Sequence, residues 1–151
     1  MFFLFLFASS QIYSMGSTEI KINFKHSRRI PFNTINMEIN QNRLFVKVAP
    51  MEGHTGFEYS NFEREIEITQ EYYEEIYRKF LNINYGIIID KSTDIIGADG
   101  TIINIIIGTS QNKMEITLWS IDYMTDVRNT TELVNLIKEI FSLVDLENYI
   151  F

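Results

Sequence analysis

The chain has 151 residues, a length typical of one domain, and 46% of them are hydrophobic against 22% charged. This mixture is typical of a chain that folds around a core. The absence of cysteine excludes disulfide bonds, thiolate nucleophiles and metal sites built on cysteine. Thirteen Lys and Arg against 20 Asp and Glu give a net charge of −7, which disfavours nucleic acid as a partner because its binding depends on basic side chains.

The N-terminus combines an apolar run with small and polar residues. Residues 1–7 read MFFLFLF and are followed by such residues up to Ser14, an order typical of the core and cleavage region of a signal peptide. The run is far shorter than the roughly 20 residues of a membrane span, so no stable membrane anchor is expected. We predict a signal peptide at residues 1–14 and a single exported domain, periplasmic or secreted, at residues 15–151. A start at Met15 would instead make the protein cytoplasmic.

Three segments in the first third alternate apolar and polar side chains, the period of a half-buried strand. They are residues 19–25, 33–39 and 43–48, and the last two are joined by a short Asn-Gln-Asn turn typical of a hairpin. The basic residues that follow the first strand are interpreted as its solvated end; they are Lys25, His26, Arg28 and Arg29. Residues 49–60 contain Pro50, Gly53 and Gly56 and predict a loop.

A fourth strand and a helix follow this loop. Residues 62–68 alternate apolar side chains with glutamates, and Thr69 is a suitable N-cap for a helix that ends near Leu81. Aromatic and aliphatic residues recur along that helix at helical spacing, which predicts one apolar stripe.

The second half predicts two more strands and a second long helix. Residues 101–107 form a β-branched run that is too apolar for an edge strand with one solvent-exposed face, so we expect it at the centre of the sheet. Residues 113–119 predict its hairpin partner, residues 82–99 leave room for a short extra strand, and residues 121–128 predict a loop. Asn129 and Glu132 have the spacing of a capping box, and the following apolar residues recur at helical spacing.

Five or six strands in local hairpins with two one-sided helices predict an α+β fold. Because three strands precede any helix, the sheet is expected to be mostly antiparallel rather than doubly wound and parallel. The predicted architecture is a two-layer sandwich with both helices on one face of the sheet.

Carboxylates concentrate around the fourth strand and the first helix, where they could present a negative surface to a basic protein partner. The residues are Glu63, Glu65, Glu67, Glu71, Glu74 and Glu75. They predict a non-enzymatic binding module, and a purely solvated face is the simpler interpretation.

The alternative function is a small hydrolase with a site in the loop at residues 50–60, where His54 lies close to Glu52. His26 and His54 together could supply the acid and base of a phosphodiester cleavage. Both histidines are also compatible with ordinary loop positions, so no catalytic residue is assigned.

No cofactor or metal site is assigned. Asp90, Ser92 and Asp94 have the spacing that begins a calcium loop, but Ile95 and Thr101 occupy positions where that loop requires glycine and glutamate. Aromatic residues that could line a groove are also compatible with packing; they are Phe57, Tyr59, Trp119 and Tyr123.

The last third of the chain carries a recognisable order of features. Asp99, Gly100 and Thr101 precede an apolar strand, a turn and a second strand that ends at Trp119 and Ser120, before a Leu-rich helix. This order resembles small bacterial exported or immunity-like α+β domains. The resemblance implies roles in turn geometry and packing for Asp99, Gly100, Trp119 and Ser120, and it implies no catalytic residue.

Overall fold

The computed structural model describes residues 18–92, 97 and 99–151, so the predicted signal peptide lies outside the described residues. The described part forms one antiparallel sheet of six strands in the order β4-β3-β2-β1-β5-β6. The strands are β1 (Glu19–His26), β2 (Thr34–Asn40), β3 (Arg43–Ala49), β4 (Phe62–Glu67), β5 (Thr101–Gly108) and β6 (Lys113–Trp119). The helices are η1 (Glu58–Ser60), α1 (Gln70–Asn82), α2 (Tyr85–Ser92), α3 (Thr125–Arg128), α4 (Thr131–Ser142) and η2 (Glu147–Tyr149).

The predicted alternation places one side of each strand in the core. Ile20 and Ile22 of β1 are fully buried, whereas Lys21 and Asn23 between them are only half-buried. Ile22 lies opposite Met37 of β2 and Ile105 of β5, so the buried side chains of neighbouring strands form continuous apolar rows.

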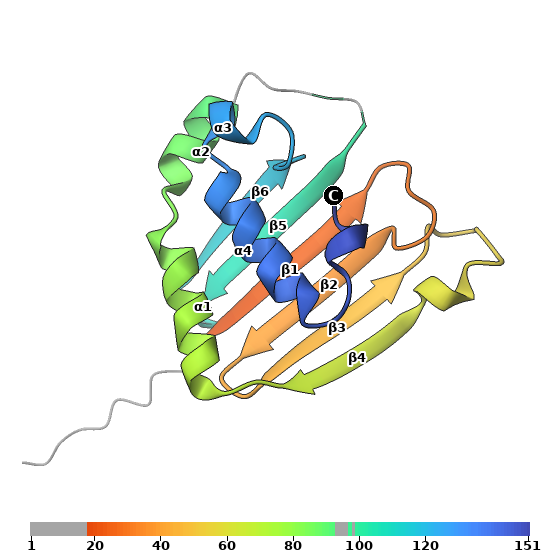
Figure 1. The fold of residues 1–151 in the computed structure, drawn as a ribbon, viewed down its shortest axis with the longest axis horizontal. Coiled ribbons are helices and arrows are strands. Elements are labelled where there is room, and N and C mark those ends of the chain that lie inside the picture. The colour runs from red at the N-terminus through yellow and green to blue at the C-terminus, as the bar shows by residue number, and fades with distance from the viewer. Residues whose placement is uncertain (1–17, 93–96, 98) are drawn as a thin grey trace, which may run out of the picture.

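The two long helices cover this apolar side together, as Figure 1 shows with α4 crossing the strands and α1 beside it. Thr69 starts α1 as predicted, because its Oγ1 accepts the backbone N–H of Tyr72 at 3.2 Å. Phe141 of α4 meets Phe24 of β1 edge to face, with ring centroids 5.7 Å apart. The predicted two-layer α+β architecture is therefore confirmed.

We call the side under α1 and α4 the covered face and the opposite side the open face. The expected central position of residues 101–107 is confirmed, because β5 lies between β1 and β6. One side of the strand is nevertheless accessible, since Ile102 is 49% exposed and Ile106 only partly buried, both on the open face. β5 alternates like the other strands, with Ile103, Ile105 and Ile107 buried. β5 is interior to the sheet, but in a two-layer fold the helices cover only one face, so the other side of every strand remains exposed to solvent.

Two connecting segments also differ from their predictions. Residues 85–92 form helix α2 rather than a strand, and the Asn84 side chain accepts the backbone N–H of Ile87 at 3.1 Å at its start. The predicted loop at residues 121–128 contains the short helix α3. Asn129 ends α3 in a left-handed conformation instead of capping α4, whose N-cap residue is Thr130.

The basic segment at the end of β1 is solvent-exposed at Lys25 and Arg28, and its backbone forms a tight, hydrogen-bonded turn. His26 Nδ1 accepts the backbone N–H groups of Arg28 and Arg29 at 3.1 and 3.0 Å. The Asn33 side chain donates to the carbonyls of His26 and Arg29, both at 2.7 Å, and closes the turn. The Arg29 guanidinium donates to the carbonyl of Tyr149, so the turn is connected to the C-terminal segment.

Across the described ranges, no helix is long and apolar enough to cross a membrane.

Candidate functional site

The strand half of the predicted acidic surface lies on the open face, where two of its three glutamates are already paired with cations. Glu63 lies 2.7 Å from Lys47 Nζ, and Glu65 lies 3.3 Å from Arg43 Nη1, both across the β3–β4 ladder. Glu67 lies opposite Arg43 in the same ladder. Exposed pairs of this kind add at most about 1 kcal/mol to stability, but they neutralise the charge that a partner would meet.

The helix half of the predicted acidic surface lies on the other side of the sheet. Glu71, Glu74 and Glu75 are all exposed on α1, which packs on the covered face. Glu74 accepts a hydrogen bond from the Gln70 side chain at 2.8 Å, and Glu75 lies 2.9 Å from Lys79 Nζ. The sheet therefore divides the predicted acidic surface into two halves that face different directions.

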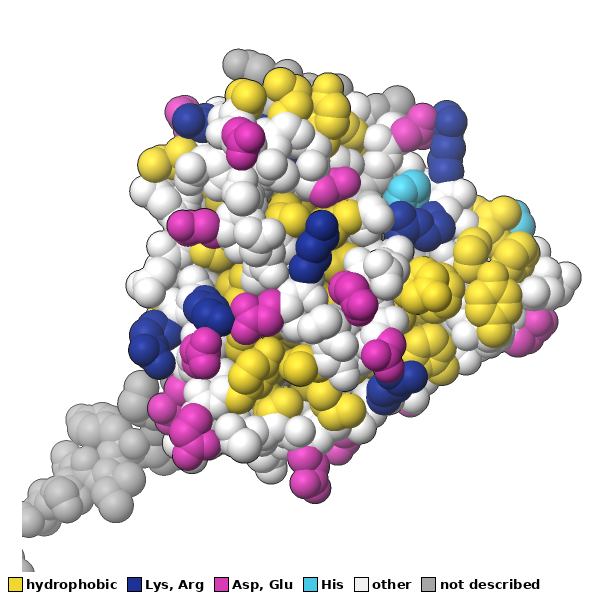
Figure 2. Space-filling model, viewed as in Figure 1, with side chains coloured by type: hydrophobic (Ala, Val, Ile, Leu, Met, Phe, Trp, Pro, Cys, Tyr) yellow, Lys and Arg dark blue, Asp and Glu magenta, His cyan; other side chains and the backbone are white. Residues whose placement is uncertain are grey.

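The helical side carries further carboxylates and a concave site. Figure 2, in the same view as Figure 1, shows acidic side chains spread over this side with fewer cations between them. A groove of about 340 Å³ lies between α1 and α4. Its lining residues are Lys79, Asn82, Ile83, Glu132, Asn135, Leu136 and Glu139.

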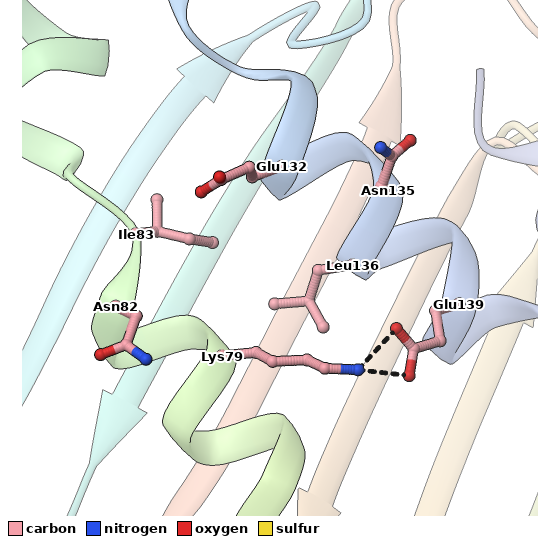
Figure 3. A pocket seen from close by; sticks show the side chains of 7 residues that line it. All are labelled: Lys79, Asn82, Ile83, Glu132, Asn135, Leu136 and Glu139. Atoms are coloured by element: carbon pink, nitrogen blue, oxygen red, sulfur yellow. Dashed lines mark hydrogen bonds and ion pairs between the residues drawn. The ribbon is translucent and has the colours of Figure 1, made fainter.

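Lys79 closes one end of this groove. Its ammonium group lies 2.9 and 3.0 Å from the two carboxylate oxygens of Glu139 on α4 (Figure 3). It also lies 2.9 Å from Glu75 on its own helix. Hydrogen bonds to Glu75 and then to Glu139 raise the pKa of Lys79 above its ordinary value, and the same ammonium group lowers the pKa of Glu75. Lys79 and Glu75 are therefore charged at neutral pH, and this end of the groove holds a cation of the chain itself.

The opposite end of the groove carries a carboxylate without such a cation. Glu132 lies seven residues before Glu139, which places the two about 10 Å apart along α4. Figure 3 shows the Glu132 carboxylate extending from α4 towards Ile83, with Leu136 between the two glutamates. Among the ion pairs of the described residues, none includes Glu132.

A second groove, of about 450 Å³, lies where the β2–β3 turn meets the start of α1. Its lining consists of amide side chains and one isoleucine; the residues are Asn40, Gln41, Asn42, Ile68 and Gln70. Because none of these side chains titrates, this groove has no acid, base or nucleophile to offer.

The loop of the alternative hydrolase site is exposed, and its residues line neither of the two grooves described. His54 Nδ1 lies 3.4 Å from the backbone carbonyl of Glu52. A catalytic histidine instead needs a substrate site and usually a side-chain partner that orients it. His26 uses its Nδ1 within the turn after β1, so the two histidines have separate local partners.

The residues that carry the family resemblance lie together at one end of β5 and β6. Gly97 and Gly100 pack against Trp119, and a side chain at either position would collide with its indole ring. Ser120 Oγ accepts the backbone N–H of Thr101 at 3.1 Å. These contacts are turn and packing interactions, while Asp94 of the considered calcium loop lies outside the described residues.

Arg128 is a structural residue that its sequence context did not indicate. It is 1% exposed, and its guanidinium donates to the carbonyls of Trp119 at 2.7 Å and Tyr123 at 3.3 Å and to that of Ser120. Its Nε also donates to Ser92 Oγ at 3.1 Å. Arg128 therefore connects the end of α2, the loop after β6 and α3.

The groove residues on α4 were also missed, because their proximity to α1 depends on tertiary packing. Glu132 and Glu139 are seven residues apart, which places them on the same face of a helix. That spacing is the signal that would have grouped them.

Comparison with known proteins gives no match: no family model matches the chain, and neither the curated proteins nor the solved structures contain a significant match.

Proposed function

We propose that this domain is a non-enzymatic binding module, of an inhibitor or immunity type, that binds a basic protein through its helical side. The acidic groove between α1 and α4 is the observation that carries the proposal. It combines a concave shape with two carboxylates of α4, Glu132 and Glu139. On the open face, by contrast, Glu63 and Glu65 of β4 are paired with Lys47 and Arg43.

The net charge of −7 gives this binding mode its physical basis. A negative surface attracts a positive partner over distances of about a Debye length and raises the association rate. Rim charges mainly affect this rate, whereas a desolvated pair in the groove would affect dissociation. The predicted signal peptide would place such an encounter outside the cytoplasm, and export remains part of the proposal.

Charge reversal on the two sides of the sheet tests the proposal. A tagged chain would be used to isolate a partner from an extract of the source organism, and the purified partner would then be titrated at low and high salt. The helical-side variant is Glu71→Lys with Glu74→Lys, and the matched control on the open face is Glu63→Lys with Glu65→Lys.

We expect the helical-side variant to associate roughly tenfold or more slowly at low salt and the difference to shrink at high salt. The open-face control, which carries the same change in net charge, should lose much less. Equal losses in the two variants, or binding that is indifferent to both, would reject the helical side as the binding surface.

A further inference from the structure

We infer that the groove between α1 and α4 receives a single arginine side chain of the basic partner, with its guanidinium on Glu132. This inference rests on the proposed function and specifies how the same surface recognises its partner. It depends on the shape of the groove, on the cation already bound within it and on the position of Glu132.

The dimensions of the groove suit one long side chain. Its volume of about 340 Å³ is at the lower end of the roughly 300–1,000 Å³ found for small-ligand sites. A partner helix or strand would not fit between α1 and α4, but an extended side chain projecting from a partner surface would.

The lining of the groove matches the two parts of such a side chain. Leu136 and Ile83 are nearly buried, at 5% and 8% exposed, and form an apolar floor between the acidic ends. The methylene groups of a long basic side chain pack on apolar surface of this kind while its charged end remains on a polar group. Asn82 and Asn135 at the margin supply amide carbonyls that accept hydrogen bonds.

Lys79 demonstrates this mode of binding within the chain itself. Its stem lies along the groove and its ammonium group binds Glu139 (Figure 3). The same ammonium group also pairs with Glu75. Glu132 at the other end offers the same kind of acceptor and has no cation within the ion-pair distance among the described residues. The groove is therefore half filled by a basic side chain of α1 and has room for a second one.

Arginine fits this acceptor better than lysine. A guanidinium presents parallel N–H groups that bind both oxygens of a carboxylate, and it is more weakly hydrated than an ammonium group. Its remaining N–H groups can donate to the amide carbonyls at the margin, which a single ammonium position would reach less completely.

The inference can be tested without any partner, by titrating the isotopically labelled chain with N-acetyl-arginine amide and following its amide resonances by NMR. N-acetyl-citrulline amide, which is neutral and nearly isosteric, is the matched control ligand. Glu132→Gln removes the proposed acceptor, and Glu67→Gln makes the same change of charge on the open face. Both residues are exposed, so both variants are expected to fold.

We expect saturable shifts around Glu132, Leu136 and Asn135 with a dissociation constant in the millimolar range or tighter, and no comparable shifts with citrulline. Glu132→Gln should weaken binding at least fivefold, whereas Glu67→Gln should change it less than twofold. Shifts scattered over all surface carboxylates, equal effects of the two variants, or no saturable binding would overturn the inference.

The same variants separate this inference from the proposed function. If a purified partner binds Glu132→Gln as tightly as the original chain, but binds the helical-side charge-reversal variant more weakly, the arginine site alone is rejected. If the partner binds that charge-reversal variant as tightly as the original chain, the proposed function is rejected, regardless of the result with N-acetyl-arginine amide.

Discussion

The two faces of the sheet are built from the same strands but have opposite chemistry. The covered face is a continuous apolar surface under α1 and α4. At the centre of the open face, Asn23 donates to Asn104 at 3.2 Å, and Asn104 donates to Glu115 and Thr117 at 3.1 and 3.0 Å. The difference teaches that polar and charged groups on the open face satisfy one another, whereas the helical side leaves carboxylates available to a partner.

The prediction with the largest expected effect compares the two faces by truncating two adjacent isoleucines of β5 to alanine. Ile105 is 1% exposed on the covered face, and Ile106 is half-exposed on the open face. Ile105→Ala should lower the free energy of unfolding by about 2–5 kcal/mol, because it leaves a cavity in the core. Ile106→Ala should cost about 1 kcal/mol or less.

Chemical denaturation of the two variants measures both values. Equal losses would mean that Ile106 is buried in solution, for example by a second copy of the chain, and would break the distinction between the faces. The same measurement at two protein concentrations identifies that case.

The second prediction concerns Arg128, whose buried guanidinium connects the end of α2, the loop after β6 and α3. Arg128→Met removes the donors to the carbonyls of Trp119 and Tyr123 and leaves buried acceptors unpaired, which should cost about 1–3 kcal/mol. Arg78→Met, on the exposed side of α1, should change stability by about 0.5 kcal/mol or less. If thermal or chemical unfolding gives Arg128→Met the same small effect, the buried guanidinium is not a structural link.

The smallest effect concerns the turn after β1. Partial burial, and then the charge of Arg29, lower the pKa of His26 below its ordinary value of about 6.5, while Asp122 and Asp99 oppose the shift. The neutral ring also accepts two backbone N–H groups, a role that protonation of Nδ1 would end. The folded state therefore binds this proton less well than the unfolded chain, so its stability should fall as the pH drops below about 6.5.

NMR titration of the His54→Asn variant follows the remaining imidazole and should place its midpoint below 6.5. His26→Asn provides a neutral side-chain acceptor of similar reach and should abolish this part of the pH dependence of stability. A midpoint above 6.5, or an unchanged pH profile in His26→Asn, would contradict the proposed role of the ring.

The sequence predicted the architecture well where periodicity determines burial. The strands of the first third, α1 and the core of α4 follow from alternation, helical spacing and the Thr69 cap. The central position of β5 was predicted correctly, but five isoleucines in seven residues conceal which of its sides is exposed, although Asn104 marks the open face. A short extra strand was left open within residues 82–99 because the apolar run at 87–89 is too short to distinguish strand from helix. The Asn84 cap was the overlooked indicator.

The candidate site was predicted only in part. Local sequence identified the glutamates of α1, but it joined them to the glutamates of β4, which the sheet places on its opposite face. The contribution of α4 and the burial of Arg128 depend on contacts between segments distant in sequence, and an isolated basic residue in a connecting segment gives no sign of them.

The order of the strands also bears on how the protein behaves at high concentration. β4 is at one margin of the sheet, and the unpaired backbone groups of a marginal strand invite another chain to extend it. A second copy aligned there would bring Glu63, Glu65 and Glu67 close to their own counterparts, and like charges in facing positions repel. The glutamates of β4 therefore disfavour edge-to-edge pairing between copies of the domain.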